Sequence, residues 1–201
     1  DFHGTVTRDP SNRFWVVPTF HPSHIQRGAF NLFGTFLFDL AKAFEVAEHG
    51  WTQDVPELIC DPSIDIWEKW VEDVLEQVRL NGPESVWLAT DIETPDKARV
   101  GDEGELGVKD RSYTITRVNF AVGPDEGITV PFIGRYIEGI KRLIESGAAL
   151  CLWNARYDIP RLRYHKCFPK GRVLDFMWAW HVLQSDTPRG LGFVAPFYSS
   201  Y

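Results

Sequence analysis

The stretch "WLATDIETP" (Trp87 to Pro95) decides how the rest of the chain is interpreted. Its apolar first half is typical of a buried strand, and the strand ends in two carboxylates, Asp91 and Glu93. Side chains two residues apart in a strand point to the same side, so we expect both carboxylates on one face of a sheet. Two like charges this close repel each other, and burial strengthens the repulsion. A divalent cation relieves it, and Mg²⁺ prefers a few carboxylate ligands in proteins.

A second stretch, "LWNARYDIP" (Leu152 to Pro160), repeats the arrangement with Asn154 and Asp158 after an apolar run. If the helix that follows begins beside the first strand, Asp158 completes the acidic site. Two metal ions roughly 3.5–4 Å apart generate a hydroxide nucleophile and stabilise the leaving oxygen of a phosphodiester. The alternative is that Asp158 only complements the dipole of its helix, and that an acidic pair after a strand has no chemical role.

Hydrophobic periodicity predicts an α/β chain. Near the N-terminus we expect a short strand over residues 14–17, a helix over 36–49 whose apolar residues recur at helical spacing, and a Pro-rich linker up to a second helix at 64–80. Strands are expected at 86–90, 113–122, 128–132 and 148–153, with a charged loop over 95–112 and helices at 136–144, 157–166 and 175–184. This order predicts a mixed sheet with helices packed on its faces.

The two acidic motifs carry a resemblance to a known family. "ATDIET" resembles the first motif of the 3′–5′ exonuclease domains related to the proofreading domain of DNA polymerase I, and "NARYD" resembles their second motif. The segment from Asp175 onward is similar to the family's next helix and loop. The resemblance covers residues 84–201 and implies a ribonuclease-H-like mixed sheet with flanking helices, and two-metal hydrolysis of 3′-terminal nucleotides with Mg²⁺ or Mn²⁺.

Carried over by position, the resemblance implies roles for individual residues. It makes Asp91, Glu93 and Asp158 the catalytic residues and the metal ligands. It also implies that Thr94, Asn154 and Tyr157 lie against the substrate, which is the single-stranded 3′ end of DNA.

The family has a third motif, which supplies a fourth carboxylate and a residue that orients the attacking water. His181 and Asp186 match its spacing, H-x-x-x-x-D, but they follow too closely on the preceding strand for the helices that normally intervene. We expect instead that His181 lies on a packing helix, that Asp186 belongs to a turn, and that the third motif lies beyond Tyr201.

The front of the chain belongs to a different pattern. "VVPTFHPSHIQRG" (Val16 to Gly28) resembles the C-terminal part of uracil-DNA glycosylases, in which the loop histidine contacts the flipped uracil. His21 would be that substrate-binding residue. The water-activating motif of that family is missing, and a base-flipping pocket needs its other wall. We therefore expect glycosylase ancestry without glycosylase activity; the alternative is that His21 lies in an ordinary polar turn.

These segments predict three parts: a partial glycosylase-like α/β segment (1–50), a linker and amphipathic helix (51–82), and an incomplete exonuclease-like domain (83–201). The chain starts at Asp1 without Met and ends within an aromatic segment, so we expect a piece of a larger replication or repair protein that also carries a polymerase. That protein is expected in the cytoplasm, in the viral case in the host cytoplasm. A non-catalytic nucleic-acid-binding or structural module, and uracil-type base excision, are the alternatives.

Composition sets limits on these functions. The 201 residues carry a formal net charge of −7, which argues against a non-specific nucleic-acid coat. No apolar run approaches the ~20 residues that cross a bilayer, so no membrane partner is expected. Three widely spaced cysteines form no zinc motif. Between Arg156 and Arg172 six Lys or Arg residues accompany a single acid, which favours either a phosphate-binding surface or an ordinary solvated helix face.

Overall fold

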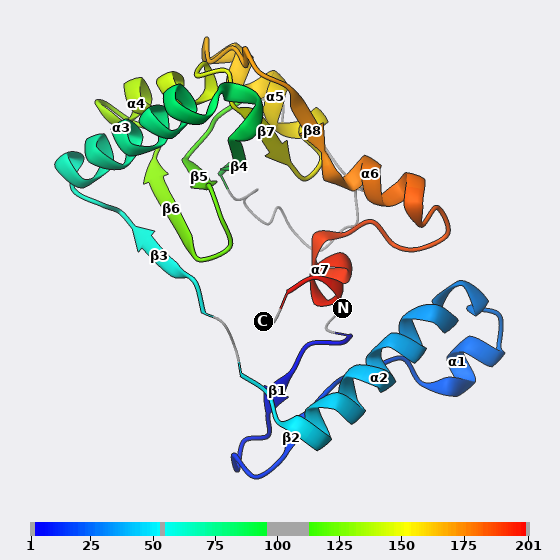
Figure 1. Ribbon diagram of the computed structural model, residues 1–201. Helices are drawn as coiled ribbons and strands as arrows, with labels where there is room; N and C mark the ends of the chain where they lie inside the picture. Colours follow the sequence, from blue (N-terminus) through cyan, green and yellow to red (C-terminus); the bar gives the residue numbers. More distant parts are fainter. Residues whose placement is uncertain (1–2, 53–54, 96–112, 200–201) are drawn as a thin grey trace, which may run out of the picture. The chain divides into compact units, whose positions relative to one another are not determined.

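The computed structural model describes residues 3–52, 55–95 and 113–199. The chain forms two compact units (Figure 1). One joins Asp1–Val55 to Met177–Tyr201 and is named here the discontinuous unit; the other, Pro56–Phe176, is named the sheet unit. These boundaries differ from the three parts expected from the sequence, which placed the breaks after residues 50 and 82. The charged loop expected over 95–112 lies, apart from Pro95, outside the described residues.

The sheet unit is built on six strands in the spatial order β3-β6-β5-β4-β7-β8. β4 pairs antiparallel with β5, and β5 antiparallel with β6. The pairs β4–β7, β7–β8 and β3–β6 are parallel. The expected mixed α/β sheet is therefore confirmed, with β4 at its centre. The strands are β3 (Glu57–Cys60), β4 (Trp87–Glu93), β5 (Arg117–Ala121), β6 (Glu126–Pro131), β7 (Ala149–Leu152) and β8 (Val173–Asp175).

One face of this sheet packs against helices. The helices are α3 (Ile64–Asn81), α4 (Tyr136–Ile144) and α5 (Ala155–Tyr164), and all three contribute to a single apolar core. Alternate residues of β4, β5 and β6 point into that core, including Leu88, Val118 and Val130, which have no exposed surface. The residues between them stay partly or fully exposed. The sheet unit thus has one covered face and one face on which polar side chains are tolerated.

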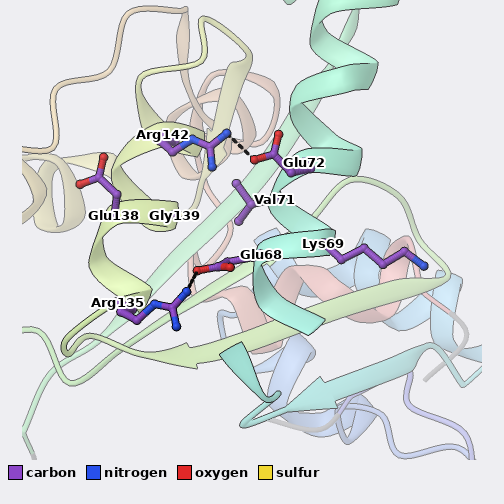
Figure 2. Close-up of a pocket in the computed structure, with 8 residues that line it drawn as sticks. All are labelled: Glu68, Lys69, Val71, Glu72, Arg135, Glu138, Gly139 and Arg142. Carbon is purple, nitrogen blue, oxygen red and sulfur yellow. Dashed lines mark hydrogen bonds and ion pairs between the residues drawn. The ribbon is translucent and has the colours of Figure 1, made fainter. Parts of the chain in front are cut away.

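Helices α3 and α4 pack closely because α4 has a glycine at their contact. Ser63 caps α3 by accepting a hydrogen bond from the N–H of Ile66, and the expected apolar face of α3 is buried at Trp67 and Trp70. A Cβ at Gly139 would overlap the indole ring of Trp67 at its Nε1. Figure 2 shows the outer rim of this contact, where Arg135 pairs with Glu68 and Arg142 pairs with Glu72.

A short edge strand lies where the sequence indicates a linker. β3 pairs with β6 in register from Glu57 to Cys60 and is otherwise largely exposed. An edge strand of this kind is held by backbone hydrogen bonds to one neighbour. Because it buries no regular apolar face, its four residues carry no alternating pattern that would predict a strand.

The discontinuous unit is organised around the buried carboxylate of Asp39. Oδ1 lies 3.0 Å from Nδ1 of His3, and Oδ2 accepts a hydrogen bond of 2.7 Å from the Thr19 hydroxyl. Nε2 of His3 lies 2.8 Å from the carbonyl oxygen of Phe193. Its elements are β1 (Thr7–Arg8), β2 (Trp15–Val16), α1 (Pro22–Gln26), α2 (Phe33–His49), α7 (Leu191–Val194), and α6 (Phe176–Leu183) from Met177 onward.

Helix α2 buries its polar side. Thr35, Asp39 and Lys42 are buried with Val46, and the ammonium group of Lys42 donates to the carbonyl oxygen of Pro196 at 3.0 Å. Burial lowers the pKa of Lys42, and the nearby Asp39 opposes that change. The helix is predicted correctly from its periodicity. Its apolar side, however, is largely exposed, at Phe33, Leu37 and Phe44.

We predict that Gly139→Ala destabilises the sheet unit by about 1–3 kcal/mol, because the added methyl overpacks the contact with Trp67. Gly34→Ala is the matched control, since Gly34 is also helical and has no neighbour within 4 Å of the added Cβ. Hydrogen exchange of the β4–β7 amides measures the effect. An unchanged exchange rate in Gly139→Ala would contradict the packing described here.

Candidate functional site

The central strand β4 places Asp91 and Glu93 together. Leu88, Thr90 and Ile92 are buried in the core, so the alternating residues, including both carboxylates, lie on the opposite, exposed face. This is the arrangement expected from the sequence.

Asn119 on β5 joins the two carboxylates. It is paired with Asp91 in the antiparallel register. Its side-chain amide donates to Oδ2 of Asp91 at 3.2 Å and to Oε1 of Glu93 at 3.4 Å. A shared donor offsets part of the repulsion between the two acids. Sequence reasoning missed Asn119; the available signal was a polar residue at an outward position of the strand "RVNFA".

Asp158 is brought against β4 from helix α5. Its side chain is only 2 % exposed, and the backbone N–H of Ile92 hydrogen-bonds to its carboxylate. Burial, reinforced by the negative charge of Asp91, raises the pKa of Asp158 from 3.8 to about 7. The Ile92 bond and the charge of Arg161 oppose that rise without cancelling it. Asp158 is therefore a carboxyl group that lacks sufficient positive charge around it.

The start of α5 is held by a carboxylate from the next strand. Asp175, at the end of β8, accepts hydrogen bonds from the backbone N–H groups of Asn154 at 3.1 Å and Ala155 at 2.9 Å. Asn154 adopts the left-handed conformation with φ 69°, which asparagine tolerates better than most residues. Asp175 thus sets where the helix begins and where Asp158 points, a positioning role that the sequence motifs did not reveal.

Thr94 and Tyr157 connect β4 to α5 beside the acidic pair. Oγ1 of Thr94 and the hydroxyl oxygen of Tyr157 lie 2.8 Å apart and share a hydrogen bond. The guanidinium of Arg161 lies 3.6 Å from the centre of the Tyr157 ring and donates to the Tyr157 carbonyl oxygen at 2.9 Å. The structure therefore brings Thr94 and Tyr157 together at the strand end that carries the acids, and Asn154 lies at the N-terminus of the same helix as Tyr157.

The remaining histidine and acid candidates lie in the discontinuous unit. His21 begins α1, and its Nδ1 accepts a hydrogen bond from the N–H of Ser23 at 3.1 Å, as in a capped turn. His181 lies in α6 against the ring of Trp178, and its Nδ1 is buried without a hydrogen-bond partner among the described residues. Asp186 is an exposed turn residue whose carbonyl oxygen accepts from Asn31.

The chemistry of the acidic group fits a divalent cation, because carboxylate oxygens are the ligands that Mg²⁺ and Mn²⁺ take. In the part of the chain that the structure describes, however, no three His, Cys, Asp or Glu side chains form a ready metal-binding cluster. Asn119 instead donates to the oxygens that a cation would take. The carboxylate oxygens that could bind a cation are thus present, but they accept hydrogen bonds from the side-chain amide of Asn119.

The basic residues between Arg156 and Arg172 differ in burial and in pairing. Arg161 is buried, Arg172 pairs with Glu84 at 3.0 Å, and Lys170 lies 3.6 Å from Glu145. Arg156 and Arg163 are exposed on α5 and form no ion pair with any residue in 3–52, 55–95 or 113–199. Exposed arginines at these two positions are compatible with both interpretations of the basic segment, a phosphate-binding surface and an ordinary solvated helix face.

Comparison of this chain with protein-family models and with curated proteins found no match. None of the helices in its described residues is both long and apolar enough to cross a membrane.

We predict a pH-dependent stability that originates from Asp158. Its folded pKa of about 7 lies above its ordinary 3.8, so between these values the folded chain keeps a proton that the unfolded chain releases. This contribution to stability is full below the unfolded pKa and is lost as the pH rises through the folded pKa. Asp158→Asn should therefore stabilise the chain more at pH 8 than at pH 4.

Urea unfolding in EDTA, followed from pH 4 to 8, measures the difference between wild type and Asp158→Asn. Asp186→Asn is the control, because that carboxylate is exposed. A difference that stays constant across this range would contradict the electrostatic environment described for Asp158.

Proposed function

We propose that this chain is part of a metal-dependent 3′–5′ exonuclease of the proofreading type, acting on the 3′ end of DNA. The observation that carries the proposal is the buried carboxyl of Asp158, placed beside Asp91 at the end of the central strand. Mutually repelling acids at one strand end, one of which has a raised pKa, are typical of functional sites rather than of ordinary surfaces. A bound divalent cation would remove the repulsion.

The topology of the sheet supports the same proposal. Numbered from β4, the strands β6-β5-β4-β7-β8 have the order 3-2-1-4-5, and only the second is antiparallel to its neighbours. A ribonuclease-H-like sheet has this order and these directions. β3 would then be an addition at one edge. Ligand sites in open α/β sheets gather at strand ends beside a change in connection, which is where β4 and β7 carry their polar residues.

Each residue then has a defined part. Asp91, Glu93 and Asp158 would hold Mg²⁺ or Mn²⁺, which when bound supplies the Lewis acid for phosphodiester hydrolysis. Asn119 orients the first two carboxylates, and Asp175 positions the helix that carries the third. Thr94, Asn154 and Tyr157 would contact the terminal nucleotide. The proposal extends to a polymerase domain in the same polypeptide, acting in the cytoplasm.

One observation favours a second candidate, a non-catalytic nucleic-acid-binding or structural module. Asn119 already donates to both exposed carboxylates, and no complete metal cluster exists among the described residues. In such a module the acids would be stabilised by the amide alone, and Mg²⁺ would be unnecessary.

The deciding experiment follows a 5′-labelled single-stranded DNA with Mg²⁺, Mn²⁺ or EDTA. It compares two proteins: the 201-residue chain, and a longer polypeptide extended past Tyr201 along the coding sequence. The longer polypeptide is included because the third motif is expected beyond Tyr201. We predict metal-dependent shortening from the 3′ end, at least by the extended polypeptide. Asp91→Asn or Asp158→Asn should lower the rate by roughly a thousandfold, corresponding to about 4 kcal/mol of lost transition-state stabilisation.

His21→Ala and Asp186→Asn are the controls, and both should leave the rate unchanged. Shortening that starts at the 5′ end, or that survives Asp91→Asn, would contradict the assignment of the acidic site. If both the 201-residue chain and the extended polypeptide are inactive with every metal, the exonuclease proposal is wrong and the non-catalytic module is the better assignment.

A further inference from the structure

Helix α5 carries a second feature beside the acidic site. Tyr157, Arg161 and Tyr164 are spaced by four and three residues, so they share one side of the helix. The opposite side is buried at Ala155, Asp158 and Leu162, whose placement the core requires. On the other side the two tyrosine rings are exposed, whereas Arg161 between them is buried.

The planar groups on this side form a continuous series. The Arg161 guanidinium lies 3.6 Å from the Tyr157 ring centre and 5.8 Å from that of Tyr113. Tyr113 in turn stacks on Tyr164, with ring centres 5.1 Å apart and planes inclined by 21°. These four residues are named here the tyrosine–arginine stack. His165 holds its far end, because its Nε2–H donates to the carbonyl oxygen of Tyr113 at 2.9 Å.

The stack is available to a ligand. Tyr113, Tyr157 and Tyr164 are 39 %, 37 % and 66 % exposed. One end is tied to the acidic strand end by the hydrogen bond from Tyr157 to Thr94. The stack thus begins beside Asp91 and Glu93 and leads away from them.

Positive charge borders the stack on one side. Arg156 and Arg163 are seven residues apart, two helical turns, and therefore lie along one flank of α5 next to the tyrosine side. Both are exposed, and neither is paired with an acid among the described residues. A row of planar rings flanked by free guanidinium groups matches the chemistry of unpaired bases on a phosphate backbone.

We propose that the tyrosine–arginine stack binds a single strand of nucleic acid as it leaves the acidic site. The proposal rests on the proposed function, which places the 3′ end of the nucleic acid at the acidic site. It adds the residues that bind the nucleotides next to that 3′ end. An exposed base stacks on the ring of Tyr164, which Tyr113 supports from the other side, while Arg156 and Arg163 contact the phosphates. A duplex cannot use the stack, because its bases already stack on one another.

The test measures binding without hydrolysis. Fluorescence anisotropy in EDTA follows a labelled oligo(dT), an oligo(U) of equal length and a blunt DNA hairpin. We expect both single strands to bind more tightly than the hairpin, and the two strands report separately on DNA and RNA. Tyr164→Ala should weaken single-strand binding by roughly 5- to 100-fold, whereas Tyr164→Phe retains it.

Arg163→Gln should weaken binding and reduce its dependence on salt, because a phosphate contact is lost. Tyr198→Ala is the matched control, as this exposed tyrosine lies in the discontinuous unit. Thermal unfolding of each variant verifies that Tyr113→Ala and Tyr164→Ala remain folded. Because Tyr164 is largely exposed, its loss should leave the midpoint unchanged.

The outcomes separate this inference from the proposed function. Binding that depends on Tyr164 but without any nuclease activity supports the stack and overturns the exonuclease. Nuclease activity combined with unaltered binding by Tyr113→Ala and Tyr164→Ala overturns the stack alone. Tighter binding of the hairpin, or no binding of any of the three probes, also overturns it.

Discussion

The central strand can bury only one of its two faces, and the rest of the sheet unit follows from that constraint. Leu88 and Ile92 must enter the core formed with α3 and α4, so Asp91 and Glu93 are forced to the other side. There the two carboxylates need a donor, which the neighbouring strand provides through Asn119. The same pleat therefore stabilises the core and concentrates negative charge at one strand end.

Asp158 shows how backbone and side-chain groups share the control of that charge. Its carboxylate accepts from a backbone N–H of the strand that carries Asp91, while burial opposes ionisation. Its own position depends on Asp175, which fixes the first turn of α5 through two backbone hydrogen bonds. Four acids from three separate segments are thus coupled, although only two of them are close in sequence.

Local sequence patterns are sufficient to predict those features of the molecule that depend on a single continuous segment. The acidic pair, the buried face of α3 and the strand-to-helix change at Asn154 follow from spacings of two, three and four residues. Asn119 could not be assigned, because its contact depends on the register between β4 and β5 across a long intervening segment. β3 could not be assigned either, because its stability comes from pairing with β6 rather than from its own composition.

Helix α2 shows the same limit of local patterns in another form, because the helix is predicted but its buried side is not. Its periodicity correctly predicts a helix, but Asp39 and Lys42 are buried because their partners come from distant parts of the chain, among them Thr19 and Pro196. Periodicity alone would have placed the apolar side inward. The polar contacts that reverse this orientation are non-local, and no window along the sequence contains both partners.

The division of the chain has a consequence for its biosynthesis. Pro56–Phe176 is continuous, whereas the unit around Asp39 needs residues from both ends, including the carbonyl groups of Phe193 and Pro196. As the polypeptide leaves the ribosome, the sheet can complete its strand pairing while residues 1–55 still lack their partners from residues 177–201. During that interval the newly made α2 exposes Asp39 and Lys42, which are buried in the folded chain, together with its exposed phenylalanines. Chaperone engagement during translation should therefore concentrate on residues 1–55 rather than on the β-sheet.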